Sequence, residues 1–346
     1  MVEKCDVSVI IPNFNRSHFL ARALNSICQQ EALPMEVIIV DDKSDDDEFQ
    51  KIQEYIIEFN KKIDIKFFRN PINMGANYCR NLGISHVESK YIAFLDSDDF
   101  WLPGKLRAQM QEIYRQKSLS TKPILSATAR YRISGNGELI ASQFGKSKFS
   151  PERIRRSNFI GTLSSIVVDA WVARHIGGFD TTLRACQDWD FFIRLSDYVD
   201  YVGVSEPLTI YVDHDEQRIT LNNTKRLSSH IHIYKKYIKD DIDEFEKSEF
   251  YRNLAEDFQM IGNRNKFLLY YSKHKATKII RSEKLLSCLT FLYFHYFKIT
   301  SKKSIKEKRY AQYARNLRKI DKKVLDLAAE QIEPLYEFRF LKDKSY

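Results

Sequence analysis

The sequence predicts an α/β protein with a Rossmann-like, mostly parallel sheet, followed by a helical region. Two observations support this class. Short apolar runs that read as buried strands alternate with segments of helical periodicity, and the connections between them are short. Such alternation is typical of a largely parallel sheet. The predicted strands are residues 7–11, 37–40, 63–68 and 91–95, and the predicted helices are 17–27, 46–60 and 75–87.

The first strand and helix show how these elements are justified. Residues 7–11 form an apolar run, and Pro12 closes it. Ser17 has the side chain of a helix N-cap. Apolar residues then recur at helical spacing over residues 20–27, which predicts that one helix face packs on the sheet.

Beyond residue 120 the pattern is less regular. Another strand is predicted at residues 160–168 and an amphipathic helix from Gln187. Two short strands are predicted at 201–204 and 208–212. The chain reads as helical after Lys225, where few helix breakers occur.

The charge distribution supports a division at this point. Residues 225–346 carry 28 Lys/Arg and 16 Asp/Glu, a net charge of +12, whereas residues 1–224 carry 27 and 30, a net charge of −3. We predict one domain over 1–224, with halves of about 1–119 and 120–224, and a basic helical domain over 225–346. The basic domain either faces an anionic partner or is simply a solvated helical surface.

The composition restricts the cellular setting. Five scattered cysteines without a C-x-x-C pair suit a reducing compartment and argue against a disulfide framework or a zinc site. No apolar run reaches the roughly 18–20 residues of a membrane span. The start of the chain enters a strand pattern at once, so we expect no signal peptide and a cytoplasmic location.

The segment YIAFLDSDDF, residues 91–100, is the most informative motif. A buried strand runs directly into Asp96, Asp98 and Asp99. Three carboxylates this close repel one another, and a hard divalent cation is the partner that offsets the repulsion. Ligands of open α/β sheets bind outside the carboxyl ends of the strands. The polar clusters 13–15, 41–42 and 96–99 all follow such ends and should converge on one crevice.

Six segments in this order and spacing resemble family 2 glycosyltransferases over roughly residues 5–220: VSVIIPNFNR, VIIVDDKSDD, NMGANYCRNLGI, YIAFLDSDD with its D-x-D, GGFD and QDWDFFIRL. The resemblance implies a GT-A fold, a nucleotide-sugar donor held with Mn²⁺ or Mg²⁺, and sugar transfer with inversion. A divalent ion bridging two phosphates neutralises the charge of the leaving group.

The resemblance also assigns donor-site roles. It makes Asp98 the direct metal ligand and places Asp96 nearer the ribose or the metal shell. Asp99 either belongs to this site or caps the next helix. In similar enzymes the position of Asp42 accepts a hydrogen bond from the uracil imide, which favours a UDP-sugar.

The base pocket is expected at the end of the first strand. Pro12 and Phe14 would line it, with the Phe14 ring as a stacking surface unless that ring is part of the core. Arg80 matches the family arginine that contacts the nucleotide or braces Asp96; otherwise it is a surface charge on its helix.

Inverting transfer needs a base on the face opposite the leaving group. Asp188 occupies the position of the usual Glu-Asp motif, but Gln187 replaces the Glu. An ordinary reading of Asp188 is a carboxylate favoured by the helix N-terminus. Asp190 is the second candidate for the base, and Trp189 is either a core residue or a platform for a sugar.

Related enzymes close a loop after the last strand, with a His near the metal and an Arg on phosphate. His214 and Arg218 match those positions, and imidazole suits Mn²⁺ better than Mg²⁺. Further on, the apolar and aromatic run at residues 285–298 has a basic flank. It reads either as an interfacial helix on the inner face of the plasma membrane or as the core of a helical bundle.

The sequence therefore predicts a metal-dependent transferase that moves a sugar from a nucleotide-sugar to a glycan or lipid-linked glycan in bacterial surface-polysaccharide or glycoconjugate synthesis. The alternative is a catalytically silent nucleotide- or glycan-binding subunit, which Gln187 keeps open. A nucleotidyltransferase needs a glycine-rich loop that IPNFNR lacks, and a processive synthase needs Q-x-x-R-W. No motif supports a nucleic-acid partner.

Overall fold

The computed structural model describes residues 3–135, 137–143, 150–213, 223–238 and 247–279. The chain divides into two compact units, Met1–Tyr237 and Ile238–Tyr346. The first unit contains all strands of the described residues.

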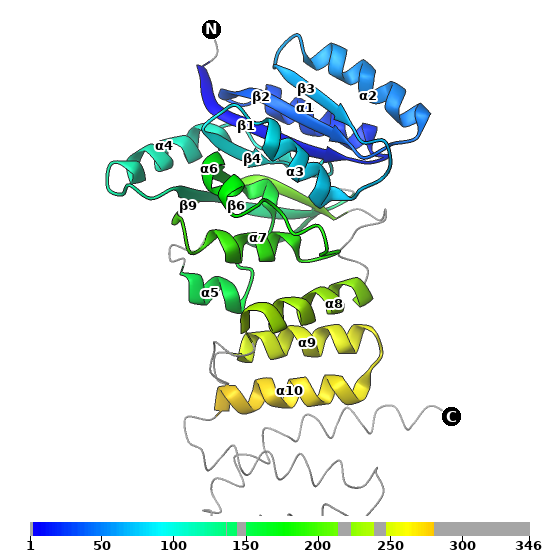
Figure 1. Cartoon of the computed structure of the whole chain (residues 1–346), viewed down its shortest axis with the longest axis vertical. Helices are drawn as coiled ribbons and strands as arrows, with labels where there is room; N and C mark the ends of the chain where they lie inside the picture. Colours follow the sequence, from blue (N-terminus) through cyan, green and yellow to red (C-terminus); the bar gives the residue numbers. More distant parts are fainter. Residues whose placement is uncertain (1–2, 136, 144–149, 214–222, 239–246, 280–346) are drawn as a thin grey trace, which may run out of the picture. The chain divides into compact units, whose positions relative to one another are not determined.

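A nine-stranded sheet forms the first unit (Figure 1). In spatial order the strands are β3 (Ile65–Arg69), β2 (Ala32–Asp41), β1 (Glu3–Asn13), β4 (Tyr91–Phe94), β8 (Ile166–Asp169), β6 (Ile124–Ser134), β9 (Asp200–Asp213) and β5 (Phe100–Trp101), with β7 (Leu139–Gln143) on β6. The pairing is parallel from β3 through β2 and β1 to β4, as predicted. Beyond β4 it is mixed: β8 runs antiparallel to β4 and β6, whereas β9 runs parallel to β6.

Helices cover both faces of this sheet (Figure 1). One face packs against α1 (Ser17–Cys28), α2 (Asp46–Phe59) and α4 (Lys105–Lys117), and the other against α3 (Ala76–His86), α6 (Ala170–His175) and α7 (Gln187–Leu195). Over the described residues of this unit, the remaining helical segments are α5 (Pro151–Arg156), the 3₁₀ turn Leu163–Ser165 and α8 (Asn223–Ile233), and the π-helical turn Tyr234–Ile238 reaches the end of the unit. The predicted α/β class is confirmed.

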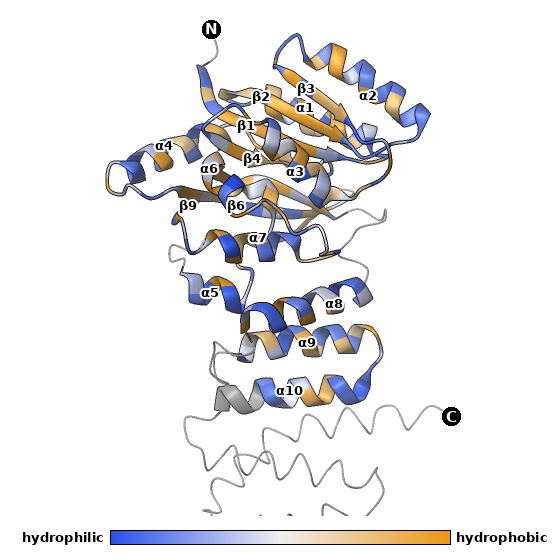
Figure 2. Ribbon diagram, viewed as in Figure 1, coloured by the Kyte–Doolittle hydropathy of each residue, from blue (hydrophilic) through white to orange (hydrophobic). Residues whose placement is uncertain are grey.

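The alternation along β1 explains the two-sided core. Val9 and Ile11 point into the apolar cluster under α1 and α4. Ile10 points to the opposite face, where a Cβ on Gly83 of α3 would lie 2.5 Å from its Cγ2. Glycine at this position therefore lets α3 lie directly on the sheet. The strands of the sheet are correspondingly apolar, while the outer helix faces are polar (Figure 2).

Three aromatic rings join the same face to α7. Phe94 of β4 meets Phe179 and Phe191 edge-on, at 5.4 and 5.8 Å between ring centroids. Phe179 and Phe191 stack on each other at 4.1 Å. These contacts fix α7 against the carboxyl half of β4, where the aspartate motif begins.

The structure corrects three predicted strands. The two strands expected at 201–204 and 208–212 form one strand, β9, with a register shift where Pro207, which lacks an N–H, faces Ala129. The strand expected at 160–168 begins only at Ile166, because residues 163–165 form a 3₁₀ turn. β6 was not predicted, since its first half is buried on both faces and shows no alternation.

The boundary between the units also differs from the predicted one after residue 224. α8 and the turn after it belong to the first unit because they bind α7 and the loop before it. The Ser229 hydroxyl accepts a hydrogen bond from the Ala185 N–H at 3.2 Å, and the Tyr237 hydroxyl donates to Asp190 at 2.7 Å.

The described part of the second unit is a helical hairpin of α9 (Ser248–Met260) and α10 (Arg264–Ile279). Phe258 and Tyr270 stack between the two helices at 5.5 Å. The predicted interfacial segment 285–298 lies outside the described residues. Among the described residues, none of the helices is both long and apolar enough to cross a membrane.

Candidate active site

Three polar strand ends meet at one edge of the sheet, as the sequence predicts. Asn13 at the end of β1 pairs with Asp41 at the end of β2. The Asp42 N–H donates to the Asn13 carbonyl at 2.8 Å, and the Leu95 N–H donates to the Ile10 carbonyl at 3.0 Å. The edge where the sequence predicts the crevice is thus formed by adjacent parallel strands, whose last backbone hydrogen bonds fix the relative positions of the loops.

Asp42 organises the loop that follows β3. Its buried carboxylate accepts hydrogen bonds from the Asn70 side chain at 2.8 Å and from the Met74 and Gly75 N–H groups at 2.8 and 2.7 Å. Gly75 has φ +88°, a backbone conformation that favours glycine. The residue predicted to read the nucleobase is therefore already oriented by three protein donors.

Phe14, which follows the end of β1, has 43% of its surface exposed, so it is not a core ring. The loop that carries it is fixed by Asn15, whose backbone is left-handed with φ +49°. The Asn15 amide exchanges two hydrogen bonds with Asp45, at 3.0 and 2.8 Å. Pro12 is buried just before it. An exposed ring on a fixed loop is suited to stack on a base.

Arg80 reaches into the crevice from α3. It is only 6% exposed, and its Nη2 lies 2.7 Å from Asp96 Oδ1. The ring of Phe179 lies 5.4 Å from the guanidinium. Arg80 is therefore not a surface charge; it braces Asp96, one of its two predicted roles.

The aspartates at 98 and 99 have different environments although they are adjacent. Asp98 Oδ2 lies 2.6 Å from Arg16 Nη1 at a partly exposed position. Asp99 is 1% exposed and accepts from the Ser164 hydroxyl at 2.6 Å and the Val212 N–H at 3.2 Å. Burial raises the pKa of Asp99 well above its ordinary value, and the charges of Asp98 and Asp96 raise it further.

The alternative role of Asp99 as a helix cap is wrong. The N-cap of α4 is Gly104, and the short strand β5 lies between Asp99 and that helix. Asp99 instead ties the aspartate loop to β9 and to the 3₁₀ turn. Arg16, which sequence reasoning missed, stands directly after the NFN segment of the first strand end, and that position was its only signal.

The donor chemistry of the crevice fits Mn²⁺ or Mg²⁺. Asp96 and Asp98 offer carboxylate oxygens, the ligands that hard cations prefer, and such ions commonly complete their shell with phosphate oxygens and water. Among the described residues, no group of three His, Cys, Asp or Glu side chains forms a closed metal site. The predicted ligand His214 and the predicted phosphate contact Arg218 lie outside the described residues.

Asp188 stands in the first turn of α7, across from the aspartate loop. Its Oδ2 accepts from Asn158 Nδ2 and its Oδ1 from the Trp189 N–H, both at 2.8 Å. Loss of hydration raises the pKa of Asp188, while the two hydrogen bonds and the charge of Arg80 oppose the rise and Asp96 adds to it. A carboxylate with a raised pKa is a better proton acceptor in catalysis.

Asp190, the second candidate for the base, is bonded within the protein. It is fully buried and accepts from Arg194 at 2.8 and 2.6 Å, from Lys236 at 3.2 Å and from Tyr237 at 2.7 Å. Trp189 is 2% exposed and donates to the Ile154 carbonyl, so it is a core residue and not a sugar platform. Asp190 is thus occupied by contacts within the fold. Asp188 is the acidic side chain of the motif on which the charges of Arg80 and Asp96 act.

Two asparagines that the sequence did not single out clamp α3 to the loop before α7. Asn77 donates to the carbonyls of Asp180 and Leu183 at 2.7 and 3.1 Å. Asn81 donates to the Phe179 carbonyl at 2.9 Å and accepts from the Phe179 N–H at 2.7 Å. A Cβ on Gly178 would lie 2.3 Å from Asn81 Oδ1. The N-x-x-x-N spacing, which puts both amides on one helix face, was the available signal.

The sheet topology and the acidic strand ends are those of the GT-A fold. The chain belongs to glycosyl transferase family 2, whose model matches residues 8–161. Over 246 residues it is 30% identical to the putative colanic acid biosynthesis glycosyl transferase WcaA of Escherichia coli K12, covering 70% of this chain and 84% of that protein. The predicted family and enzyme class are confirmed.

Two further similarities concern sequence and fold. The chain is 27% identical over 161 residues to the UDP-Glc:alpha-D-GlcNAc-diphosphoundecaprenol beta-1,3-glucosyltransferase WfgD of Escherichia coli, covering 46% of this chain and 59% of that one. Residues 1–349 of Staphylococcus aureus TarS in complex with UDP-GlcNAc share the fold, with a TM-score of 0.57, 16% identity, and coverage of 82% and 86% of the two chains.

Proposed function

We propose that this glycosyltransferase moves a sugar, with inversion, from a nucleotide-sugar to a hydroxyl group of a glycan or lipid-linked glycan during surface-polysaccharide or glycoconjugate synthesis. The observation that carries the proposal is the placement of Arg80. It is ion-paired with Asp96 on the donor side, and its charge acts on Asp188 on the other side. Asp96, the carboxylate proposed to bind the donor, and Asp188, the candidate base, thus both interact with Arg80.

The donor half binds the nucleotide in this proposal. Pro12 and Phe14 line the base pocket, with the Phe14 ring stacked on the nucleobase, and Asp42 accepts the imide N–H while its other hydrogen bonds hold the 70–75 loop. TarS, which shares the fold, binds UDP-GlcNAc, and this supports a UDP-sugar.

Asp98 and Asp96 hold Mn²⁺ or Mg²⁺ in this proposal, with His214 as a further metal ligand and Arg218 on the diphosphate. The ion supplies neutralisation of the diphosphate charge as the sugar leaves. Arg80 keeps Asp96 in place for this role. Asp99, held by Ser164 and Val212, fixes the backbone of the same loop.

Asp188 acts as the general base. It removes the proton of the acceptor hydroxyl while that oxygen bonds to the anomeric carbon, and the bond from the same carbon to the diphosphate oxygen breaks. A single displacement of this kind inverts the anomeric configuration. The two hydrogen bonds to Asp188 orient its carboxylate, and its raised pKa improves proton transfer.

The name of one relative supports the proposed acceptor, and the charge of the C-terminal region supports the proposed location. The name of WfgD specifies a diphosphoundecaprenol acceptor, which supports a lipid-linked acceptor here. The net charge of +12 over residues 225–346 suits contact with an anionic bilayer. We propose a cytoplasmic enzyme that is peripheral on the inner face of the plasma membrane, without a nucleic-acid partner.

A silent binding subunit is the second candidate, favoured by Gln187 in place of the usual glutamate. Release of nucleoside diphosphate from UDP-, dTDP- and GDP-sugars separates the two. The assay is run with Mn²⁺, Mg²⁺ or EDTA, with and without a panel of GlcNAc-diphosphate lipid and glycan acceptors. We expect metal-dependent release from one donor that an acceptor accelerates. Tight nucleotide binding without release under every condition would favour the silent subunit.

A further inference from the structure

A four-residue turn, Asn158–Gly161, borders the candidate base. The Asn158 Oδ1 accepts from the Gly161 N–H at 2.8 Å, and its Nδ2 donates to the Gly161 carbonyl at 3.2 Å and to Asp188 Oδ2 at 2.8 Å. This pattern fixes the orientation of the amide. In the flipped amide Oδ1 would face two acceptor oxygens and Nδ2 would face an N–H.

Asp188 is consequently held through both of its oxygens. The Trp189 N–H binds Oδ1 from within α7, and Asn158 binds Oδ2 from the separate turn. A carboxylate that accepts only from its own helix can still rotate, whereas a second donor on the other oxygen stops the rotation. Each oxygen has a second lone pair, so the carboxylate keeps the capacity to accept a hydroxyl proton.

The far side of the turn rests on Arg130 of β6. The Ile160 carbonyl accepts a hydrogen bond from the Arg130 guanidinium. Gly161 has φ +95°, and a Cβ there would lie 1.9 Å from the nearest guanidinium nitrogen. The guanidinium therefore occupies the space that any side chain at position 161 would need. The turn is fixed on one side by the sheet and presents Asn158 on the other.

The charges around Asp188 come from three elements. Arg80 of α3 and Asp96 of the aspartate loop act on it with opposite signs. Arg130 of β6 is attracted by Asp188 and by Asp99. In the described residues the carboxylate accepts hydrogen bonds from the Asn158 side chain and the Trp189 N–H, both uncharged, so replacing Asn158 by Ala changes orientation without removing a charge.

We propose that Asn158 is a positioning residue, held by the Arg130-backed turn, that sets the orientation of the Asp188 carboxylate for attack by the acceptor hydroxyl. This inference rests on the proposed role of Asp188 as the base. Asn158 contacts the base and not the substrate, so its effect should appear in kcat and in the pH profile and not in donor affinity.

The test compares Asn158→Ala and the isosteric Asn158→Asp with Asn60→Ala. Asn60 also holds a turn through its amide oxygen, which accepts from the Ile65 N–H at 2.9 Å at an exposed position outside the crevice. The readouts are kcat, the KM for the donor, the pH profile of kcat, UDP affinity and the melting temperature. A hydrogen bond to a charged group contributes about 1.5–3 kcal/mol, so Asn158→Ala should lower kcat about 10- to 150-fold.

The pH profile of kcat shows in which direction the pKa of Asp188 changes in the variants. Loss of a donor to the ionised carboxylate raises the pKa of Asp188, so the acid limb of the kcat profile should move to higher pH. Asn158→Asp places a like charge beside Asp188 and should move the limb further. UDP affinity should match that of the wild type in both variants.

Two outcomes would overturn the inference. One is a kcat and an acid limb equal to those of Asn60→Ala in a folded Asn158 variant; the isosteric Asp variant decides if the Ala variant does not fold. The other is a rise in the KM for the donor at unchanged kcat, which would make Asn158 a donor contact. An inactive Asp188→Asn enzyme beside fully active Asn158 variants refutes this inference alone, whereas an active Asp188→Asn enzyme refutes the proposed base itself.

Discussion

Asp190→Ala should lower the stability of the folded protein strongly, whereas it removes no proposed contact with the substrate. The fully buried carboxylate accepts two hydrogen bonds from Arg194, one from Lys236 and one from Tyr237. Removing one partner of a buried ion pair costs about 3–5 kcal/mol. Lys236 is partly exposed, and Arg194 keeps bonds to two backbone carbonyls, so we expect the lower end, about 3 kcal/mol.

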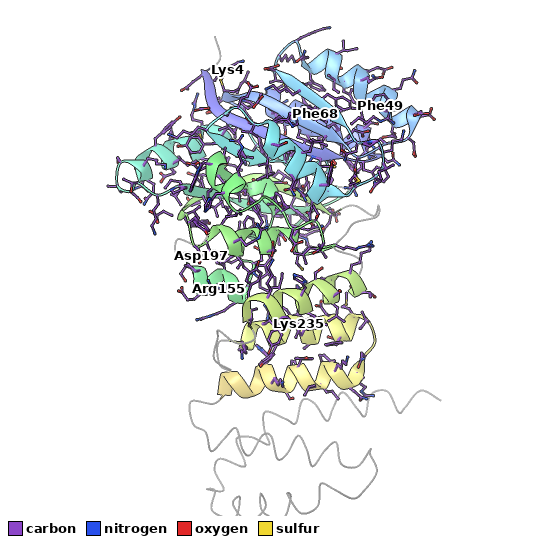
Figure 3. The ribbon with its side chains drawn as sticks, viewed as in Figure 1. Lys4, Phe49, Phe68, Arg155, Asp197 and Lys235 are labelled. Carbon is purple, nitrogen blue, oxygen red and sulfur yellow. The ribbon has the colours of Figure 1, made fainter. Side chains whose placement is uncertain are left out.

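For a unit of this size about 1 kcal/mol shifts the melting temperature by roughly 2–4 °C, so the expected loss is about 6–12 °C. Circular dichroism of the ligand-free protein measures it. Asp197→Ala is the matched control, because Asp197 follows the same helix and pairs with Arg155 at 3.2 Å on the surface (Figure 3). It should shift the melting temperature by less than about 3 °C. An Asp190→Ala protein that melts like this control but has lost transfer would show that Asp190 is the base.

The other predictions concern the proposed roles directly. Asp98→Ala should abolish metal-dependent UDP binding, measured by calorimetry, and leave the melting temperature of the ligand-free protein nearly unchanged, because its ion pair with Arg16 is partly exposed; wild-type affinity would refute the metal assignment. Asp188→Asn should retain UDP binding and lose transfer. Because the pKa of Asp188 is raised and the base must be ionised, wild-type kcat should fall as pH drops through a value above the ordinary Asp pKa of about 3.9; a flat profile down to that value would contradict this. Phe14→Ala should weaken UDP binding about 5- to 150-fold through loss of stacking, without a change in stability, since the ring is exposed; unchanged affinity would show that the nucleobase does not stack on Phe14.

The donor half could be predicted in detail because its information is local. The apolar runs at residues 7–11, 37–40 and 91–95 are buried on both faces and end in polar clusters, so the strands and the meeting of their polar ends follow from short segments. The acceptor half could not be predicted to the same extent. The first half of β6 is buried on both faces, which removes the alternation that would mark it as a strand.

The same limit applies inside the site. Asp98 and Asp99 are adjacent and chemically identical in the sequence, yet one pairs with Arg16 and the other is sealed against Ser164 and β9. The contact of Asn158 with Asp188 joins residues that no periodic pattern connects. A motif can locate the carboxylates, but burial and distant partners assign their separate tasks.

The clamp between α3 and the loop before α7 has a consequence for engineering. Asn77 and Asn81 bind backbone groups about a hundred positions further along the chain, and Gly178 leaves room for one of these amides. A chimaera that imports a foreign acceptor half by a cut near residue 120 would replace Gly178 and its loop while retaining both asparagines. The loop and the two asparagines must therefore be exchanged together, so the modular unit of acceptor specificity is discontinuous in sequence.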